Sequence, residues 1–292
     1  MSQDHRLQRQ RFELKYQIPE SVTAPMRDFV RSYLELDEYG ADSPDLRYPV
    51  HSLYLDSPDL QTFHASVNGA KNRFKLRLRY YDEKPHTPVF FEIKGRVDNC
   101  ILKQRCGVRR SAVSTLLSGH LPHPDDLMSH EPRHLAALQQ FFKLQQGIQA
   151  TPKAHVFYTR EAWVSHNDNS VRVTFDRHVH IEPCFKSYAT TQSRKPIRVF
   201  QPVILEVKFT TRFPDWLEDL VRTFNLMRGS ASKYCEGVIG LGESQFHDGD
   251  RATSEADLDP FFGSDRLAAA EPVSTQSSPD LESLRKLNLQ VS

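Results

Sequence analysis

Basic side chains at every second position of one segment are the strongest chemical signal in this sequence. The basic residues are Arg73, Lys75, Arg77 and Arg79, and the apolar residues between them are Phe74, Leu76, Leu78 and Tyr80. Successive side chains of a β-strand point to opposite faces, so these four cations would share one face. Arginine offers a fixed fork to phosphate oxygens and lysine offers a mobile point charge. The spacing therefore predicts a strand that binds phosphate groups.

The same alternation recurs in other segments and adds isolated carboxylates to the cations. Its charged or polar positions include Glu13 and Lys15, Glu92 and Lys94, Lys103 and Arg105, Tyr158 and Arg160, and Glu206 and Lys208. Residues 71–110 contain twelve Lys or Arg and four Asp or Glu, although the chain has a formal net charge of only +1. A solvated sheet face usually mixes charge signs, so this excess favours a surface built for a polyanion. The carboxylates Glu13, Glu92 and Glu206 are predicted to hold Mg²⁺ or Mn²⁺ that bridges phosphate oxygens.

The elements that would position these residues are mostly strands. Strand patterns cover residues 11–18, 50–55, 73–81, 89–96, 100–108, 154–165, 171–176, 179–184 and 203–209. Helical spacing covers three segments, 22–34, 132–146 and 214–227, and hairpin turns are expected at Asn68-Gly69 and at residues 167–169. A run of strands interrupted by a few helices predicts an α+β fold with a largely antiparallel sheet.

A basic face can point inward only if the sheet closes on itself. We therefore expect an antiparallel barrel of about eight strands, with its apolar face outward and covered by the three helices. Like charges repel strongly in a confined lumen, so such a barrel would need a polyanion inside it. The implied ligand is a chain of phosphates.

The rest of the composition bounds the domain organisation. Residues 1–246 are expected to form one domain, and residues 247–292 a disordered acidic tail, since residues 248–292 contain nine acidic and four basic residues and few aromatic ones. No apolar stretch approaches the roughly 18 residues of a membrane span, and the first ten residues are polar, so a cytoplasmic protein with four reduced, structural cysteines is expected. Any membrane partner would be a separate protein.

Seven short segments, in order along residues 11–240, resemble the polyphosphate polymerase domain of the vacuolar transporter chaperone (VTC) family, within the triphosphate tunnel metalloenzymes of the CYTH-like superfamily. The segments are RFELKY (11–16), SLYLD (52–56), KLRLR (75–79), FEIK (91–94), KQR (103–105), LEVK (205–208) and SKY (232–234). The resemblance implies an antiparallel tunnel in which ATP donates its γ-phosphoryl group to a growing polyphosphate chain.

The resemblance also implies roles for individual residues. The predicted substrate-binding residues are Lys15, Arg77, Arg79, Lys94, Lys103, Arg105, Tyr158, Arg160, Ser232 and Lys233. Among them Arg77, Arg79, Lys94 and Lys233 are the predicted catalytic residues, and Glu206 would hold the metal. Phosphoryl transfer spreads negative charge over oxygens, so aligned cations and a metal ion supply most of the stabilisation without a general base.

Three other functions remain open on the sequence. A tunnel triphosphatase is disfavoured because Arg11 stands where such hydrolases carry the first acid of Glu-x-Glu-x-Lys. A non-catalytic polyphosphate or nucleotide sensor is kept open by Ser66, near where the polymerases carry a basic residue. A nucleic-acid binder is the weakest alternative, because Phe74, Tyr80 and Phe91 fall on the face opposite the cations and could not interleave with them.

Overall fold

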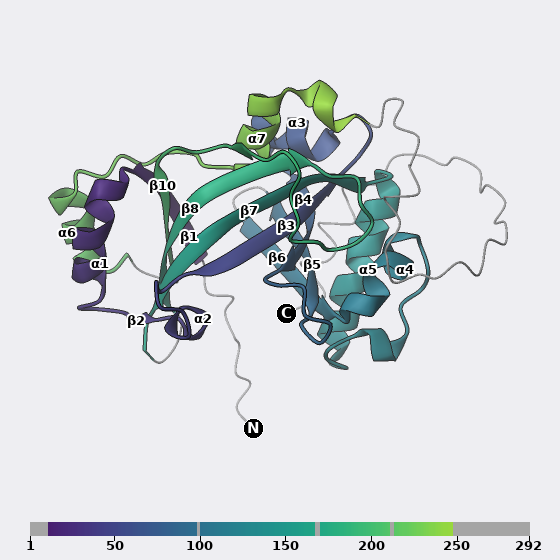
Figure 1. Cartoon of the computed structure of the whole chain (residues 1–292), viewed down its shortest axis with the longest axis horizontal. Coiled ribbons are helices and arrows are strands. Elements are labelled where there is room, and N and C mark those ends of the chain that lie inside the picture. The colour runs from purple at the N-terminus through teal and green to yellow at the C-terminus, as the bar shows by residue number, and fades with distance from the viewer. Residues whose placement is uncertain (1–10, 98–99, 167–169, 211–212, 248–292) are drawn as a thin grey trace. The chain divides into compact units, whose positions relative to one another are not determined.

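The computed structural model describes residues 11–97, 100–166, 170–210 and 213–247 (Figure 1). The hairpin turn expected at residues 167–169 and the acidic tail from residue 248 onward lie outside the described residues. The structure confirms the α+β class.

Ten strands of the described chain form one antiparallel sheet. They are β1 (Arg11–Ile18), β2 (Glu35–Leu36), β3 (Tyr48–Asp56), β4 (Arg73–Tyr80), β5 (Val89–Val97), β6 (Cys100–Val108), β7 (Thr151–Val164), β8 (Val171–Pro183), β9 (Ile197–Arg198) and β10 (Val203–Thr210). The main order is β1-β10-β8-β7-β3-β4-β5-β6, with β2 paired to β7 and β9 paired to β8. All the strand patterns are confirmed, although two of them join into β8 around His178, whose φ of 51° lies in the left-handed region.

Seven helices accompany the sheet in the described residues. They are α1 (Thr23–Val30), α2 (Glu38–Ala41), α3 (Gln61–Val67), α4 (Val113–Leu117), α5 (Pro132–Gly147), α6 (Asp215–Thr223) and α7 (Lys233–Leu241). The three predicted helices correspond to α1, α5 and α6, but the expectation of only three was wrong. The other helices have four to nine residues, which is too short for a clear periodic pattern.

The hairpin expected at Asn68-Gly69 is also absent, because the chain before it is helical. Asn68 is the C-terminal cap of α3, so this turn joins a helix to β4. The start of α3 is fixed by the buried carboxylate of Asp56, which accepts hydrogen bonds from the backbone N–H groups of Thr62 and Phe63. A carboxylate at this place satisfies donors that have no partner within the helix.

The expected closed barrel was wrong, because the sheet is open and β1 and β6 stand at its two ends. Other segments take up hydrogen-bonding positions at both ends. At β1, Tyr16 bridges to Arg228, and the N–H of Gly229 donates to the carbonyl of Lys15. At β6, the N–H of Met128 donates to the carbonyl of Gly107. Backbone N–H and C=O groups of β1 and β6 that already have hydrogen-bond partners do not need to pair with the opposite end of the sheet.

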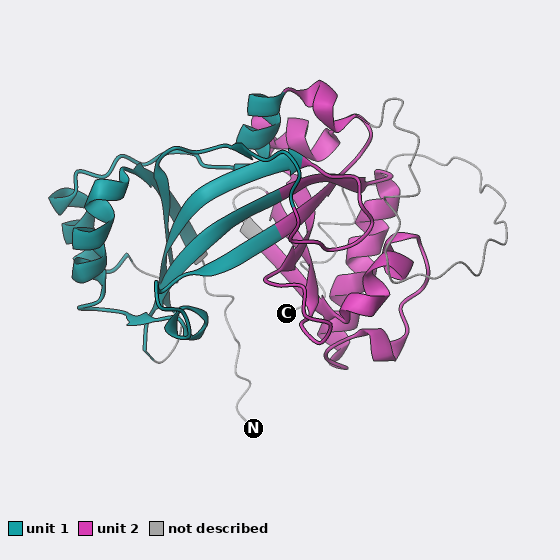
Figure 2. Cartoon of the chain, viewed as in Figure 1, with its two compact units in different colours: residues 1–51, 156–182, 193–241 teal, residues 52–155, 183–192, 242–292 magenta. Residues whose placement is uncertain are grey.

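The described chain divides into two compact units (Figure 2). Unit 1 contains residues 1–51, 156–182 and 193–241, and unit 2 contains residues 52–155, 183–192 and 242–292. In unit 2, Leu76 and Leu78 of β4 and Phe91 of β5 lie in a core beneath α5, where Phe91 contacts Phe141 edge to face at 5.0 Å. The alternation predicted for β4 is therefore confirmed, with its apolar face toward the helix.

Unit 1 repeats this arrangement with different elements. Val207 of β10 and Phe175 of β8 lie in a core with Met26 of α1 and Leu217 of α6. Figure 1 shows α1 and α6 together, and the ring of Phe29 meets that of Phe224 edge to face. In both units the helices cover the apolar face of the strands, as expected.

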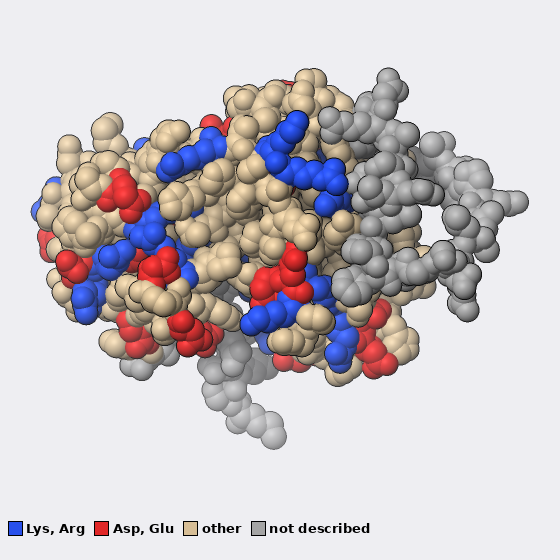
Figure 3. Space-filling model, in the orientation of Figure 1, with Lys and Arg blue, Asp and Glu red and all other residues tan. Residues whose placement is uncertain are grey.

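Charges of both signs share one face of the surface, and three cysteines are reduced. On the face drawn in Figure 3, basic and acidic side chains are interspersed, so that face carries no field of one sign. Cys106, Cys184 and Cys235 are buried and form no disulfide. Within the described residues, no helix has both the length and the apolar character needed to cross a membrane.

Candidate functional site

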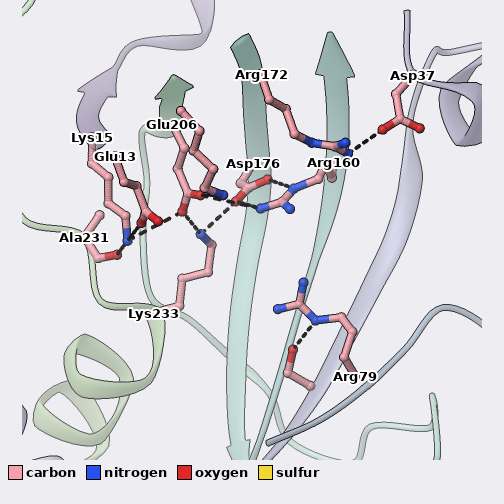
Figure 4. Close-up of polar contacts among 12 residues, drawn as sticks. Glu13, Lys15, Asp37, Arg79, Arg160, Arg172, Asp176, Glu206, Ala231 and Lys233 are labelled. Carbon is pink, nitrogen blue, oxygen red and sulfur yellow. Dashed lines mark hydrogen bonds and ion pairs between the residues drawn. The ribbon is translucent and has the colours of Figure 1, made fainter. Parts of the chain in front are cut away.

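Unit 1 gathers charged side chains on the face of its strands opposite the core (Figure 4). We call this group the carboxylate cluster; its members are Glu13, Lys15, Arg160, Asp176, Glu206, Lys208 and Lys233. Strands β1, β10, β8 and β7 supply all of these residues except Lys233, which is the first residue of α7. Residues distant in sequence therefore meet at one place.

The strand register explains how the carboxylate cluster forms. In the β1–β10 pair, Lys15 lies opposite Glu206 and Glu13 lies opposite Lys208. Each cation therefore faces an acid, which stabilises the pairing of the strands. In the β10–β8 pair, Ile204 is the residue opposite Asp176, so Glu206 and Asp176 are diagonal neighbours on one face.

Asp176 and Glu206 are the centre of the carboxylate cluster. Both oxygens of the fully buried Asp176 carboxylate accept hydrogen bonds from Arg160, from Nε at 2.7 Å and from Nη2 at 2.8 Å. The Lys233 ammonium lies 2.7 Å from Asp176 Oδ2 and 3.1 Å from Glu206 Oε1 (Figure 4). Lys15 Nζ lies 3.2 Å from Glu13 Oε1 and 3.6 Å from Glu206 Oε1. Each ammonium thus joins two carboxylates.

These contacts determine the charge states in the carboxylate cluster. Burial alone would raise the pKa of Glu206, but Lys208, Lys233 and the other nearby cations outweigh it and hold that pKa well below its usual range. The pKa of Asp176 is lowered in the same way, chiefly by Arg160. Burial would lower the pKa of Lys233, but the two carboxylates raise it above its ordinary value. At neutral pH all of these groups are charged.

Two predicted hydroxyl contacts border the carboxylate cluster. The ring of Tyr158 lies beneath the charges of Lys233, at 4.8 Å, and Arg160, at 5.2 Å. The Ser232 hydroxyl accepts a hydrogen bond from the N–H of Cys235 in the first turn of α7. Ser232 therefore helps to fix the start of the helix that carries Lys233.

Unit 2 contains a second charged group, on the face of β4, β5 and β6 opposite its core. We call it the cation cluster; its members are Arg77, Arg79, Glu92, Lys103 and Arg105. Glu92 Oε2 accepts hydrogen bonds from Arg77 Nε at 2.8 Å and Nη2 at 2.6 Å. Glu92 Oε1 lies 3.4 Å from Arg105 Nε and 3.5 Å from Lys103 Nζ. The single carboxylate of Glu92 thus compensates part of the charge of several cations.

Two more predicted site residues, Arg79 and Lys94, lie on strands of unit 2. Arg79 Nε donates to the hydroxyl of Ser52 on β3 at 3.1 Å (Figure 4). Lys94 lies opposite Lys75 on β4 and opposite Lys103 on β6. Three lysines thus lie in line across neighbouring strands, and one of them, Lys103, is within 3.5 Å of Glu92.

Comparison with known proteins supports the sequence resemblance. A family model described as the VTC domain matches residues 10–241. The chain belongs to the VTC domain family. No match to this VTC domain was found among curated proteins.

Solved structures give weaker likenesses. A proposed adenylate cyclase from Bacillus halodurans has 12% identity and a TM-score of 0.43, covering 77% of this chain and 94% of its own. A protein from Pyrococcus horikoshii OT3 has 14% identity and a TM-score of 0.40, covering 80% of this chain and 99% of its own. At such low similarity these proteins say nothing about what this VTC domain binds.

The predicted site residues of the VTC domain fall into two sets, one in each compact unit. Unit 1 holds Glu13, Lys15, Tyr158, Arg160, Glu206, Ser232 and Lys233, whereas unit 2 holds Arg77, Arg79, Glu92, Lys94, Lys103 and Arg105. Glu92 thus belongs to a different set from Glu13 and Glu206, with which it was grouped as a metal ligand.

Sequence reasoning missed two residues that contact the predicted ones. Asp176 binds Arg160 and Lys233, and the hydroxyl of Tyr54 accepts a hydrogen bond from Arg77 Nη1 at 3.2 Å. Asp176 falls on a charged strand face by alternation with Arg172, so its parity was a usable signal, whereas the alternate positions of β3 around Tyr54 carry no such row of charges. Their partners lie 16 to 57 residues away, and sequence spacing does not reveal such contacts.

The carboxylate cluster offers the oxygen donors that Mg²⁺ and Mn²⁺ prefer. Within the described residues, no three His, Cys, Asp or Glu side chains gather as a ready ligand group. The carboxylates instead occur in pairs, Glu13 with Glu206 around Lys15, and Asp176 with Glu206 around Lys233. One or two carboxylates together with phosphate oxygens are the usual Mg²⁺ ligands at nucleotide sites, so these pairs fit such a metal.

Proposed function

We propose that this VTC domain transfers the γ-phosphoryl group of ATP to a polyphosphate chain, with Mg²⁺ or Mn²⁺ as cofactor. The observation that carries the proposal is the carboxylate cluster, where Lys15, Arg160 and Lys233 converge on buried carboxylates. Charged groups held in fixed positions in a buried site stabilise the charge that develops during phosphoryl transfer.

The two clusters suit different parts of this reaction. The carboxylate cluster has nearly balanced charge, with four cations and three carboxylates. The cation cluster has one carboxylate, Glu92, among four cations. A strong positive excess favours binding of a polyanion, whereas mixed charges favour a site that also holds a metal ion.

Glu206 would hold the metal, with Glu13 and Asp176 as the neighbouring carboxylates, although Arg160 and Lys233 already bind both oxygens of Asp176. The metal would supply charge neutralisation at the transferring phosphoryl group. Lys233 and Arg160 would bind phosphate oxygens and orient them, and the Tyr158 ring beneath them would restrict their movement. No side chain needs to accept a proton, because the acceptor phosphate is already ionised at neutral pH.

A non-catalytic polyphosphate or nucleotide sensor is the second candidate. It is favoured by one observation, that the Glu206 oxygens already contact Lys15, Lys208 and Lys233. The charge of this carboxylate is therefore compensated by the protein's own cations. A sensor would bind the same phosphates and release no product.

The test is to incubate the protein with ATP and Mn²⁺ or Mg²⁺ and to separate the phosphate products on a gel. We expect a metal-dependent polyphosphate ladder that is lost in Glu206→Gln and kept in Glu218→Gln, an exposed control with the same charge change. Free phosphate without a ladder would indicate a triphosphatase. Binding of ATP with neither product would indicate the sensor.

A double variant tests the cation cluster separately. Arg77→Ala with Arg79→Ala should abolish binding of triphosphate while the strands and helices still form, and the melting temperature should fall because the buried Glu92 carboxylate loses its Arg77 partner. Calorimetry measures the affinity, and far-ultraviolet circular dichroism checks the fold. An unchanged nucleotide affinity would contradict a phosphate-binding role for this face.

A further inference from the structure

The Arg77 guanidinium is held on two edges by acceptors from two other strands. Its Nε and Nη2 donate to Glu92 of β5, and its Nη1 donates to the hydroxyl of Tyr54 on β3. Tyr54 and Glu92 are both buried, with 7% and 2% of their surface exposed, so their own positions are fixed by packing. The position of Arg77 is therefore fixed as well.

Glu92 also lies between cations that would otherwise repel one another. Its Oε1 is within 3.5 Å of Lys103 and Arg105, while its Oε2 binds Arg77. Burial alone would raise the pKa of Glu92, but Arg77 and the neighbouring cations hold that pKa well below its usual range. The carboxylate is ionised at neutral pH, and its charge lowers the repulsion within the cation cluster.

We propose that Glu92 and Tyr54 are positioning residues, which hold Arg77 and its neighbouring cations in a fixed arrangement for the phosphates of a polyanion, and that Glu92 is not a metal ligand. This inference rests on the proposed function, because it assumes that the cation cluster binds phosphates. Glu92 acts through Arg77, Lys103 and Arg105, and Tyr54 acts through Arg77, which donates a hydrogen bond to its hydroxyl.

The positioning role makes predictions that differ from those of two other roles that the buried Glu92 carboxylate could have, a contribution of charge alone and the binding of a metal ion. If Glu92 only contributed charge, its neutralisation would raise the net positive charge and strengthen polyanion binding. If it bound metal, its neutralisation would change the response to Mn²⁺ and would not weaken metal-free binding. If Glu92 is a positioning residue, its neutralisation should weaken metal-free binding and leave the response to Mn²⁺ unchanged. The reason is that cations released from a shared acceptor must be ordered again when the ligand binds.

The test measures binding of inorganic tripolyphosphate by calorimetry, first with EDTA and then over a Mn²⁺ titration. In Glu92→Gln we expect the metal-free affinity to fall roughly tenfold, although the variant gains positive charge. The Mn²⁺ concentration for half-maximal enhancement should not change. Glu131→Gln makes the same charge change at an exposed position of unit 2, 56% exposed, and should bind like the unaltered protein.

Tyr54→Phe provides a second variant that keeps the charge at neutral pH and removes only the hydroxyl. It should weaken metal-free binding by roughly threefold to tenfold, the factor expected for one lost hydrogen bond. This variant keeps the inference testable if Glu92→Gln fails to fold, which thermal melting would reveal.

The outcomes distinguish this inference from the proposed function. Unchanged or tighter metal-free binding in both variants would overturn the positioning role while leaving the proposed function intact. A shift confined to the Mn²⁺ response of Glu92→Gln would make Glu92 a metal ligand and overturn the inference. Failure of the unaltered protein to bind tripolyphosphate at all would overturn the proposed function, and this inference with it.

Discussion

Asp176→Asn should destabilise the protein strongly, because it removes one charge from a buried group with two cationic partners. Asp176 has none of its surface exposed. It accepts two hydrogen bonds from Arg160 and forms an ion pair with Lys233. Asparagine keeps the volume but leaves Glu206 as the nearest remaining carboxylate, at 3.1 Å from Lys233 and 3.9 Å from Arg160.

The expected loss follows from breaking a buried ion pair while leaving its cations in place. Such changes cost about 3 to 5 kcal/mol in the free energy of unfolding. For a protein of this size each kcal/mol corresponds to about 2 to 4 °C in melting temperature, so Tm should fall by about 6 to 20 °C. The exposed acid Asp28 makes a loose contact with Arg31 at 3.9 Å, so Asp28→Asn should change stability by less than about 1 kcal/mol.

Urea unfolding followed by circular dichroism measures the free energy, and adding tripolyphosphate tests the function of the site. Asp176→Asn leaves two buried cations short of negative charge, so a bound polyanion should stabilise this variant more than the unaltered protein. A ligand at one hundred times its Kd stabilises by about 2.7 kcal/mol. A loss below about 1 kcal/mol, or equal stabilisation of both proteins by tripolyphosphate, would refute the reasoning.

Two further predictions concern pH and packing. The pKa of Lys103 is lowered to about 8 by burial and by the neighbouring arginines, and that of Tyr54 is lowered to about 8, because the nearby cations outweigh burial. Raising the pH from 7 to 9 therefore removes most of the positive charge of Lys103 and adds most of a negative charge at Tyr54. Calorimetry should show weaker tripolyphosphate binding at pH 9, with a smaller decline in Lys103→Met. A decline of equal size in that variant would contradict this. Gly237→Ala would place a Cβ 2.4 Å from Ile181 Cδ1. Urea unfolding should therefore show a loss of about 1 to 3 kcal/mol in the free energy of unfolding, partly recovered by Ile181→Val. An unchanged free energy of unfolding would contradict this packing.

The sequence by itself determined which side chains share a strand face. The separation of Arg77 and Arg79 from Leu76 and Leu78 follows from the two-residue period of a strand, which is a local property of the backbone. For the same reason the α+β class and the eight longer strands could be predicted, whereas β2 and β9, with two residues each, carry no alternation and were missed. Short helices such as α3 were missed, because they depend on one capping carboxylate, Asp56, and carry too few residues for a periodic signal.

Only the tertiary structure decided which charged groups meet and whether the sheet closes. The pairing of Asp176 with Lys233 depends on strand register and on the placement of α7, which no local pattern specifies. Glu92 and Glu206 have the same residue type and the same spacing from a lysine, yet their partners come from different strands and different units. In the described chain, residues 228 and 229 bond to β1 and Met128 bonds to β6, and no local pattern specifies these contacts. Long-range contacts of this kind follow from the global packing of the chain, whereas alternation follows from the backbone alone.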